Sequence, residues 1–101
     1  WIADYNDAYS FLEQFDSADN GNNDTGWENA QYAELLAQSN VETDSAKRTE
    51  LLLQAEQIFM DEMPAAPIYY YTNLYVQKDY VSGMEPDALG NINLKYADVN
   101  K

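Results

Sequence analysis

The sequence contains neither cysteine nor histidine. Without cysteine there is no disulfide framework, no thiolate nucleophile and no thiolate-bound metal site. Without histidine as well, serine and cysteine triads and imidazole-bound zinc are excluded within these residues. The four glycines are scattered and form no phosphate-binding motif. We therefore expect no catalytic residues, no metal site and no cofactor in this chain.

Positive charge is also scarce, with 5 basic residues against 18 acidic ones and a net charge of -13. No lysine or arginine precedes Lys47, whereas ten of the acidic residues do. A field of this sign repels phosphate backbones, so we expect no nucleic-acid partner. The chain has no run of about 20 apolar residues, the length that a membrane-spanning helix needs.

Acidic residues could also bind calcium or catalyse glycoside hydrolysis, but the sequence has only weak signals for either. The polar loop over residues 16–26 has Asp16, Asn20 and Gly21 at the first, fifth and sixth positions of a calcium loop. However, Ala18 occupies the third position and Trp27 replaces the bidentate acid, which favours an ordinary solvated loop. A glycosidase fragment would need two carboxylates across a cleft, about 5 to 9.5 Å apart, and 18 acidic residues always offer such pairs.

The first two thirds of the chain carry three helical patterns. Each has a capping residue followed by apolar residues three or four positions apart. Asn6 or Asp7 is the cap of the first helix, Asn29 of the second, which ends near Asn40, and Asp44 of the third. The apolar faces are Ala8, Phe11, Leu12 and Phe15; Tyr32, Leu35, Leu36 and Ser39; and Leu51, Leu52, Ala55, Ile58, Phe59 and Glu62 or Met63. The spacing of Asp44 and Arg48 also predicts an exposed ion pair along the third helix.

The helical pattern stops at residues 63–67, because Pro67 forces the residue before it out of the helical region. Ile68–Tyr71 follows, and its aromatic and β-branched residues favour an inner strand or a connection between two packed bodies. Further strands are predicted over Leu74–Lys78 and Ile92–Tyr96, with a turn at Tyr80–Gly83. Since this tail has no apolar layer of its own to pack on, we expect it to pair with strands outside this sequence.

Asp4 stands out near the beginning of the chain, because it follows three apolar residues instead of lying in the polar loop beyond them. This position suggests a strand end that faces a cavity. A carboxylate in a partly dry site needs a cation or several N–H donors. The alternatives are that Asp4 only starts a turn or a helix, and that Trp1 is a core residue.

Four stretches of the sequence together resemble one family. These are Trp1–Asp7, the Asn-rich loop that ends in Thr25-Gly26-Trp27, the helix from Arg48 through Glu56, and Met63–Asn73 with its Pro-x-Tyr-Tyr-Tyr-x-Asn pattern. In this order they resemble the C-terminal part of oligopeptide-binding proteins, the family 5 extracellular solute-binding proteins of ABC importers. Ala8 departs from the pattern, since the family often has proline there.

The resemblance implies an α/β architecture: the C-terminal segment of a two-lobed, type II periplasmic-binding-protein-like fold that closes on its ligand by hinge motion. Three helices would be followed by a crossing strand and a strand and loop tail. Residues 1–72 would belong to the C-terminal lobe. Residues 73–101 would form a hinge crossing and a return segment that packs on the N-terminal lobe.

The resemblance also implies binding roles without catalysis. Asp4 would pair with the α-ammonium of an oligopeptide, Trp1 and the backbone of Ile2 and Ala3 would line the groove, and Tyr71 would offer its hydroxyl to the peptide backbone. The partners would be the peptide and the permease subunits of the ABC transporter. The location would be extracytoplasmic, on a cell-surface lipoprotein or in the periplasm, with membrane contact only through a lipid anchor or the permease.

Two alternatives to these roles stay open. Tyr69–Tyr71 could be hinge packing without ligand contact, and alternation in an extended chain directs Tyr70 away from its two neighbours. The chain as a whole could be a stand-alone acidic interaction module with no role in transport.

Overall fold

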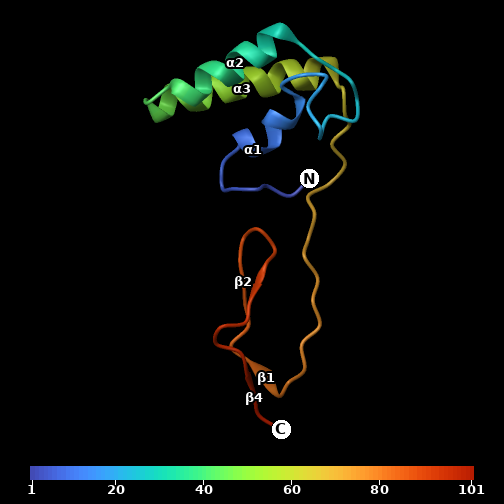
Figure 1. Cartoon of the computed structure of the whole chain (residues 1–101), viewed down its shortest axis with the longest axis vertical. Coiled ribbons are helices and arrows are strands. Elements are labelled where there is room, and N and C mark those ends of the chain that lie inside the picture. The colour runs from blue at the N-terminus through green and yellow to red at the C-terminus, as the bar shows by residue number, and fades with distance from the viewer. The chain divides into compact units, whose positions relative to one another are not determined.

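Helices fill the first part of the chain and short strands the last part (Figure 1). The computed structural model describes residues 1–101 and divides them into two units, Trp1–Pro67 and Ile68–Lys101. The first unit contains α1 (Tyr9–Leu12), the 3-10 helix η1 (Glu13–Phe15), α2 (Ala30–Val41) and α3 (Ser45–Glu62). The second contains β1 (Val81–Ser82), β2 (Glu85–Pro86), β3 (Ile92–Asn93) and β4 (Asp98–Val99). The chain therefore has three α-helices and a few short strands, as an α/β segment.

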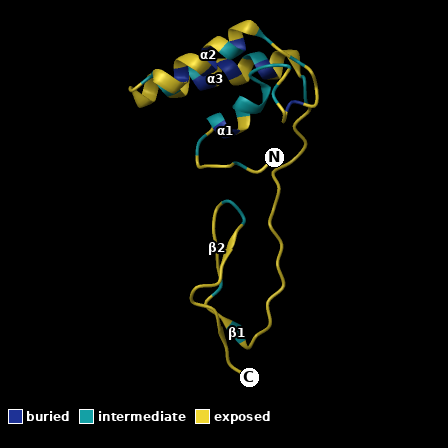
Figure 2. Ribbon diagram, in the orientation of Figure 1, coloured by how far each residue is buried: buried dark blue, intermediate teal, exposed yellow.

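The core of the first unit lies between α2 and α3, which pack side by side (Figures 1 and 2). The predicted face of α2 is confirmed, and that of α3 is confirmed as far as Phe59, because the buried apolar residues are among those expected from the helical spacing: Tyr32, Leu35, Leu36, Leu52, Ala55 and Phe59. The extension of the α3 face to Glu62 or Met63 is wrong, since both residues are exposed. The aromatic rings of this core meet at angles, with the centroids of Phe15 and Phe59 4.7 Å apart. Trp27 stands edge-on to Tyr32 at 5.0 Å, which is a favourable geometry for aromatic pairs.

The two longer helices begin at the predicted caps. The Asn29 side chain accepts hydrogen bonds from the backbone N–H groups of Gln31 and Tyr32, at 2.9 and 3.0 Å. The Asp44 side chain accepts the corresponding bonds from Ala46 and Lys47, at 2.9 and 3.1 Å. Each cap satisfies N–H groups that have no partner inside the helix, which explains why the helices start there.

The first helix is shorter than predicted. The N-cap position is Ala8, which makes no side-chain cap bond, and not Asn6 or Asp7 as predicted. The Asp7 Oδ1 nevertheless accepts a hydrogen bond of 2.8 Å from the Tyr9 N–H, and α1 has four residues and tightens into η1. Leu12 and Phe15 pack against the core as expected, whereas Ala8 and Phe11 are exposed. A helix of one turn does not recover the cost of its own nucleation, so packing against α3 has to hold it.

The predicted crossing strand is absent from the structure, and so is the strand expected over Leu74–Lys78. Residues 68–78 have no regular secondary structure, and Tyr70 is 98% exposed. Aromatic and β-branched residues favour a strand only where a ladder partner and a packed face are present. No such partner adjoins this stretch, so the interpretation as an inner strand is wrong for this chain.

The strands of the second unit pair with one another as two antiparallel two-stranded sheets. β1 pairs with β4, with Val81 opposite Val99, and β2 pairs with β3, with Pro86 opposite Ile92. The predicted strand over Ile92–Tyr96 thus forms over two residues only, and β1 lies where a turn was expected. Pairing of this tail with strands outside the sequence stays a prediction, as does the assignment of residues 1–72 and 73–101 to two lobes. None of the helices combines the length and the apolar character that crossing a bilayer requires.

Candidate peptide-binding segment

The predicted ligand-binding residues at the beginning of the chain form a segment without regular structure in the first unit. Trp1 and Ile2 expose about half of their surfaces, at 53% and 57%. Ala3 is half-buried and Asp4 is exposed. The segment therefore presents two large apolar side chains and one carboxylate to its surroundings.

Ser10 of α1 fixes both ends of this segment. The indole Nε1–H of Trp1 donates a hydrogen bond of 2.9 Å to the Ser10 carbonyl. The backbone N–H of Asp4 donates one of 2.9 Å to the Ser10 Oγ. Ser10 itself is fully buried. The backbone of Asp4 is therefore held, while Asp4 as a residue is exposed.

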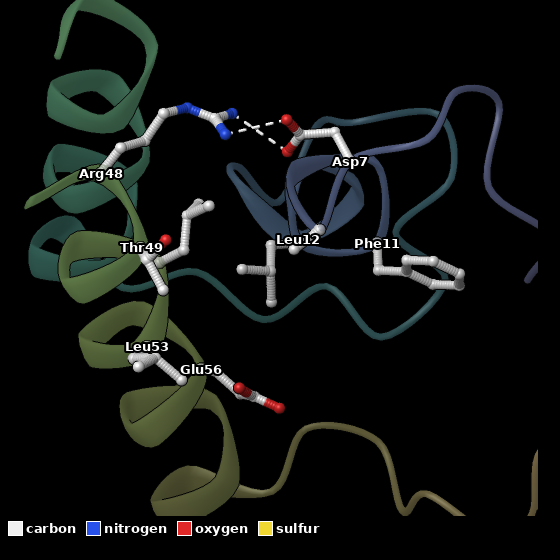
Figure 3. A pocket seen from close by; sticks show the side chains of 9 residues that line it. Asp7, Phe11, Leu12, Arg48, Thr49, Leu53 and Glu56 are labelled. Atoms are coloured by element: carbon white, nitrogen blue, oxygen red, sulfur yellow. Dashed lines mark hydrogen bonds and ion pairs between the residues drawn. The ribbon is translucent and has the colours of Figure 1, made fainter. Parts of the chain in front are cut away.

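An ion pair ties the end of the same loop to the helices (Figure 3). Arg48 of α3 binds Asp7 with both terminal nitrogens, Nη1 to Oδ2 at 2.8 Å and Nη2 to Oδ1 at 3.0 Å. Its Nε donates a further bond of 3.1 Å to the carbonyl of Ser39 near the end of α2. The hydrogen bond from Arg48, the backbone N–H of Tyr9 and the charge of the guanidinium lower the pKa of Asp7 below its ordinary value. The predicted pair of Arg48 with Asp44 is wrong, because the Asp44 carboxylate caps α3 instead.

The ion pair borders a groove of about 450 Å³ between α1 and α3 (Figure 3). Its walls are mostly apolar, with Leu12 from α1 and Leu53 from α3, while Glu56 adds a second carboxylate. A neighbouring hollow of about 390 Å³ is lined by Trp1, and Phe11 and Glu56 line both spaces. Trp1 thus lies against an apolar surface that continues along α3.

Tyr71 belongs to the second unit and is 76% exposed. Its ring stacks on that of Tyr69, with the centroids 5.5 Å apart and the planes at 29°. Tyr70 is 98% exposed between them. The two stacked rings share one side of the extended chain, as residues two apart do.

Sequence reasoning missed Ser10 and the ion pair of Asp7 with Arg48. One signal for Arg48 was available, since Lys47 and Arg48 are the only basic residues before Lys78 and ten acidic residues precede them. The spacing along the helix favoured Asp44 as the partner of Arg48, whereas the structure pairs Arg48 with Asp7. For Ser10 the only hint was a small polar residue between the aromatic residues Tyr9 and Phe11.

The structure contains no group of three or more acidic side chains placed to hold a metal ion. The segment places an exposed acidic residue on an anchored backbone, beside apolar and aromatic side chains. Such a surface suits a ligand that carries a positive charge next to apolar groups.

Searching against family models gave no match. Individual proteins are nevertheless similar in sequence to the chain. The chain is 50% identical over 97 residues to the oligopeptide-binding protein OppA of Bacillus subtilis, covering 96% of this chain and 18% of that protein. It is 39% identical over 100 residues to the dipeptide-binding protein DppE of the same organism, covering 99% of this chain and 18% of that protein. It is also 46% identical over 83 residues to the probable deoxycholate-binding periplasmic protein YgiS of Escherichia coli, covering 82% of this chain and 15% of that protein.

These relatives are binding proteins and not enzymes. The chain spans less than a fifth of the length of each of them. The first two of these relatives match the chain along nearly all of its residues, at 50% and 39% identity. The chain therefore belongs to the family of oligopeptide-binding proteins and corresponds to one segment of such a protein.

Proposed function

We propose that these residues form part of a solute-binding protein that captures oligopeptides outside the cytoplasmic membrane and delivers them to an ABC importer. The protein would have the two-lobed, type II binding-protein fold. Residues 1–72 would lie in its C-terminal lobe, and residues 73–101 would cross the hinge and pack on the N-terminal lobe. The similarity to proteins named for oligopeptide and dipeptide binding supports this proposal.

The observation that carries the proposal is the exposed carboxylate of Asp4 on a backbone held by Ser10. A fixed anion is suited to the α-ammonium of a peptide, because charge-assisted hydrogen bonds are short and strong. Trp1 and the backbone of Ile2 and Ala3 would line the peptide-binding groove of the whole protein. Recognition through main-chain hydrogen bonds would tolerate peptides with many different side chains. The Tyr71 hydroxyl would add a bond to the peptide backbone.

The same carboxylate argues for a peptide over the ligand named for the relative YgiS. Deoxycholate is an anion, and an anionic group beside the exposed Asp4 would be disfavoured by like-charge repulsion. A peptide with a free amino terminus presents the complementary charge. Peptides are therefore the ligand class that this segment favours.

An extracytoplasmic location follows from the proposed role. Several relatives are named as periplasmic proteins, among them OppA of Salmonella typhimurium. Another is named as an uncharacterised lipoprotein of Mycobacterium bovis, at 37% identity over 73 residues. Both names fit a protein held in the periplasm or on the cell surface by a lipid anchor, with the permease subunits of the transporter as its partners.

Asp4→Asn in the full-length protein tests the proposal. We expect titration calorimetry to show a loss of about 10-fold or more for a peptide with a free amino terminus, because a hydrogen bond to a charged group is removed. The N-acetylated form of the same peptide should lose far less. Asp24→Asn, at an exposed position in the polar loop, is the matched control. Equal losses for both peptides would remove the proposed role of Asp4.

A further inference from the structure

Ser10 holds two residues of the proposed binding segment from a buried position. Its carbonyl accepts a hydrogen bond from Trp1 and its hydroxyl oxygen accepts one from Asp4, at 2.9 Å each. The two donors lie nine and six residues away along the chain. Ser10 has no exposed surface, so water does not compete for these bonds.

The carbonyl of Ser10 is available because α1 is so short. The last four carbonyls of an α-helix have no partner inside it, and α1 contains only four residues, Tyr9–Leu12. The indole of Trp1 satisfies one of these groups. The shortening of the first helix, which contradicted the sequence pattern, thus creates an acceptor for Trp1.

The residues just before Ser10 are also held in place. Asp7 accepts a bond from the Tyr9 N–H at 2.8 Å and forms the ion pair with Arg48 of α3. Arg48 also donates to the Ser39 carbonyl at 3.1 Å. Asp7, three residues before Ser10, is therefore connected through Arg48 to both α2 and α3.

We infer that Ser10 is a positioning residue for ligand binding, which holds the backbone of Asp4 and the ring of Trp1 so that carboxylate and indole meet the peptide together. The inference rests on the proposed function. Fixing the backbone of Asp4 before the ligand arrives removes part of the ordering cost that binding would otherwise carry. Ser10 acts through Asp4 and does not itself touch the ligand.

The test is a double-mutant cycle in the full-length protein, with Ser10→Ala, Asp4→Asn and the combination of both. Ser10→Ala removes the acceptor for the Asp4 N–H and keeps the carbonyl that binds Trp1. We expect a loss of about 2- to 10-fold in affinity for a peptide with a free amino terminus, which corresponds to one hydrogen bond. The N-acetylated peptide should lose less than 2-fold, about the smallest effect attributed to one hydrogen bond. In the Asp4→Asn background the same change should have no further effect, because the charge that Ser10 positions is already gone.

Ser39→Ala is the matched control. Ser39 is also fully buried, but its hydroxyl donates to the carbonyl of Leu36 within α2, and the alanine variant keeps the backbone carbonyl that accepts from Arg48. This variant should lower the thermal midpoint in a similar way and leave the preference for free amino termini unchanged. Ser10→Cys is a second test variant, since it nearly keeps the side-chain volume and offers only a weak acceptor. It should show the same selective loss if Ser10→Ala fails to fold.

The outcomes separate the inference from the proposal beneath it. If Asp4→Asn is selective for free amino termini but the Ser10 variants weaken both peptides equally, the role of Ser10 is overturned and that of Asp4 stands. If the loss caused by Ser10→Ala persists in full in the Asp4→Asn background, Ser10 does not act through Asp4. If Asp4→Asn itself is not selective, both are overturned.

Discussion

Arg48 and Asp7, which are 41 residues apart in the sequence, form an ion pair through two contacts of 2.8 and 3.0 Å. Both side chains are about 30% exposed. The planar guanidinium matches the two carboxylate oxygens, which is why arginine and not lysine suits such a site. The pair joins the loop that carries the proposed binding residues to the helix that carries the core.

Removing the charge of Asp7 should destabilise the 101-residue chain in a pH-dependent way. Asp7→Asn keeps an oxygen that can accept the Tyr9 N–H, so the change isolates the ion pair. Because the pKa of Asp7 is lowered in the folded state, its contribution is present above the pKa of the unfolded chain, about 3.9, and is lost as the pH falls through the folded value. We expect a difference in unfolding free energy of about 1 kcal/mol at pH 7, the upper range for exposed pairs.

Urea unfolding of both proteins between pH 7 and pH 2 measures this difference. It should stay constant down to about pH 5 and vanish at the acidic end. Asp19→Asn, at an exposed loop position, is the control and should change little. A difference between wild type and Asp7→Asn that does not depend on pH would show that the ion pair contributes nothing.

Phe59 links the aromatic rings in the core of the first unit. It is 9% exposed, and its ring lies 4.7 Å from Phe15 and 5.9 Å from Trp27. Phe59→Ala should cost about 3 to 5 kcal/mol through lost burial and the cavity left behind. In a core of six buried apolar side chains this loss should unfold the helices, as far-ultraviolet circular dichroism would measure.

Leu53→Ala on the same helix is the matched control for Phe59→Ala. Leu53 is 57% exposed, so its truncation should cost about 0.5 kcal/mol or less. If the two variants unfold at the same urea concentration, the packing of α2 on α3 described above is wrong.

Substitutions of Asp44 test whether its carboxylate caps α3 or pairs with Arg48. Because its carboxylate caps α3 and Arg48 turns to Asp7, Asp44→Ala should lose about 1 kcal/mol of stability. Asp44→Asn should be nearly neutral, since asparagine caps equally well. Thermal unfolding of the two variants distinguishes the roles: a pair with Arg48 would be lost equally in both.

The helices could be predicted from the sequence because their signals are local. Asn29 and Asp44 each precede an apolar pattern with helical spacing, and a cap acts within three residues. The strands could not be predicted in the same way. Ile68–Tyr71 and Leu74–Lys78 have the composition of strands, but pairing depends on a partner that spacing does not reveal.

The candidate site likewise contains residues that local patterns indicate and residues that depend on long-range contacts. Trp1 and Asp4 were singled out by their place beside apolar residues and by the family resemblance. The roles of Ser10 and Arg48 depend on contacts across 9 and 41 residues, which appear only once α1, α2 and α3 are packed. Local patterns therefore suffice to propose Trp1 and Asp4 as ligand-binding residues, which stays a prediction, whereas the residues that hold them could be found only from the fold.

The second unit depends on Gly83, which precedes its second sheet. Gly83 has a φ of +71°, and a Cβ placed on it would lie 1.9 Å from the carbonyl oxygen of Tyr96. Gly83→Ala should therefore cost about 1 to 2 kcal/mol for the left-handed conformation alone. The steric overlap with Tyr96 adds to this cost, so the pairing of Val81 with Val99 should open.

Amide hydrogen exchange measured by NMR on the 101-residue chain would report this opening at Val81 and Val99, while the core amides of α2 and α3 keep their protection. Gly21→Ala is the matched control, because no atom lies within 4 Å of the added Cβ. It should leave exchange in both units unchanged. Sheets of two-residue strands are only marginally stable, so one blocked contact is enough to separate them. Unchanged exchange at Val81 in Gly83→Ala would contradict the close approach to Tyr96 on which this argument depends.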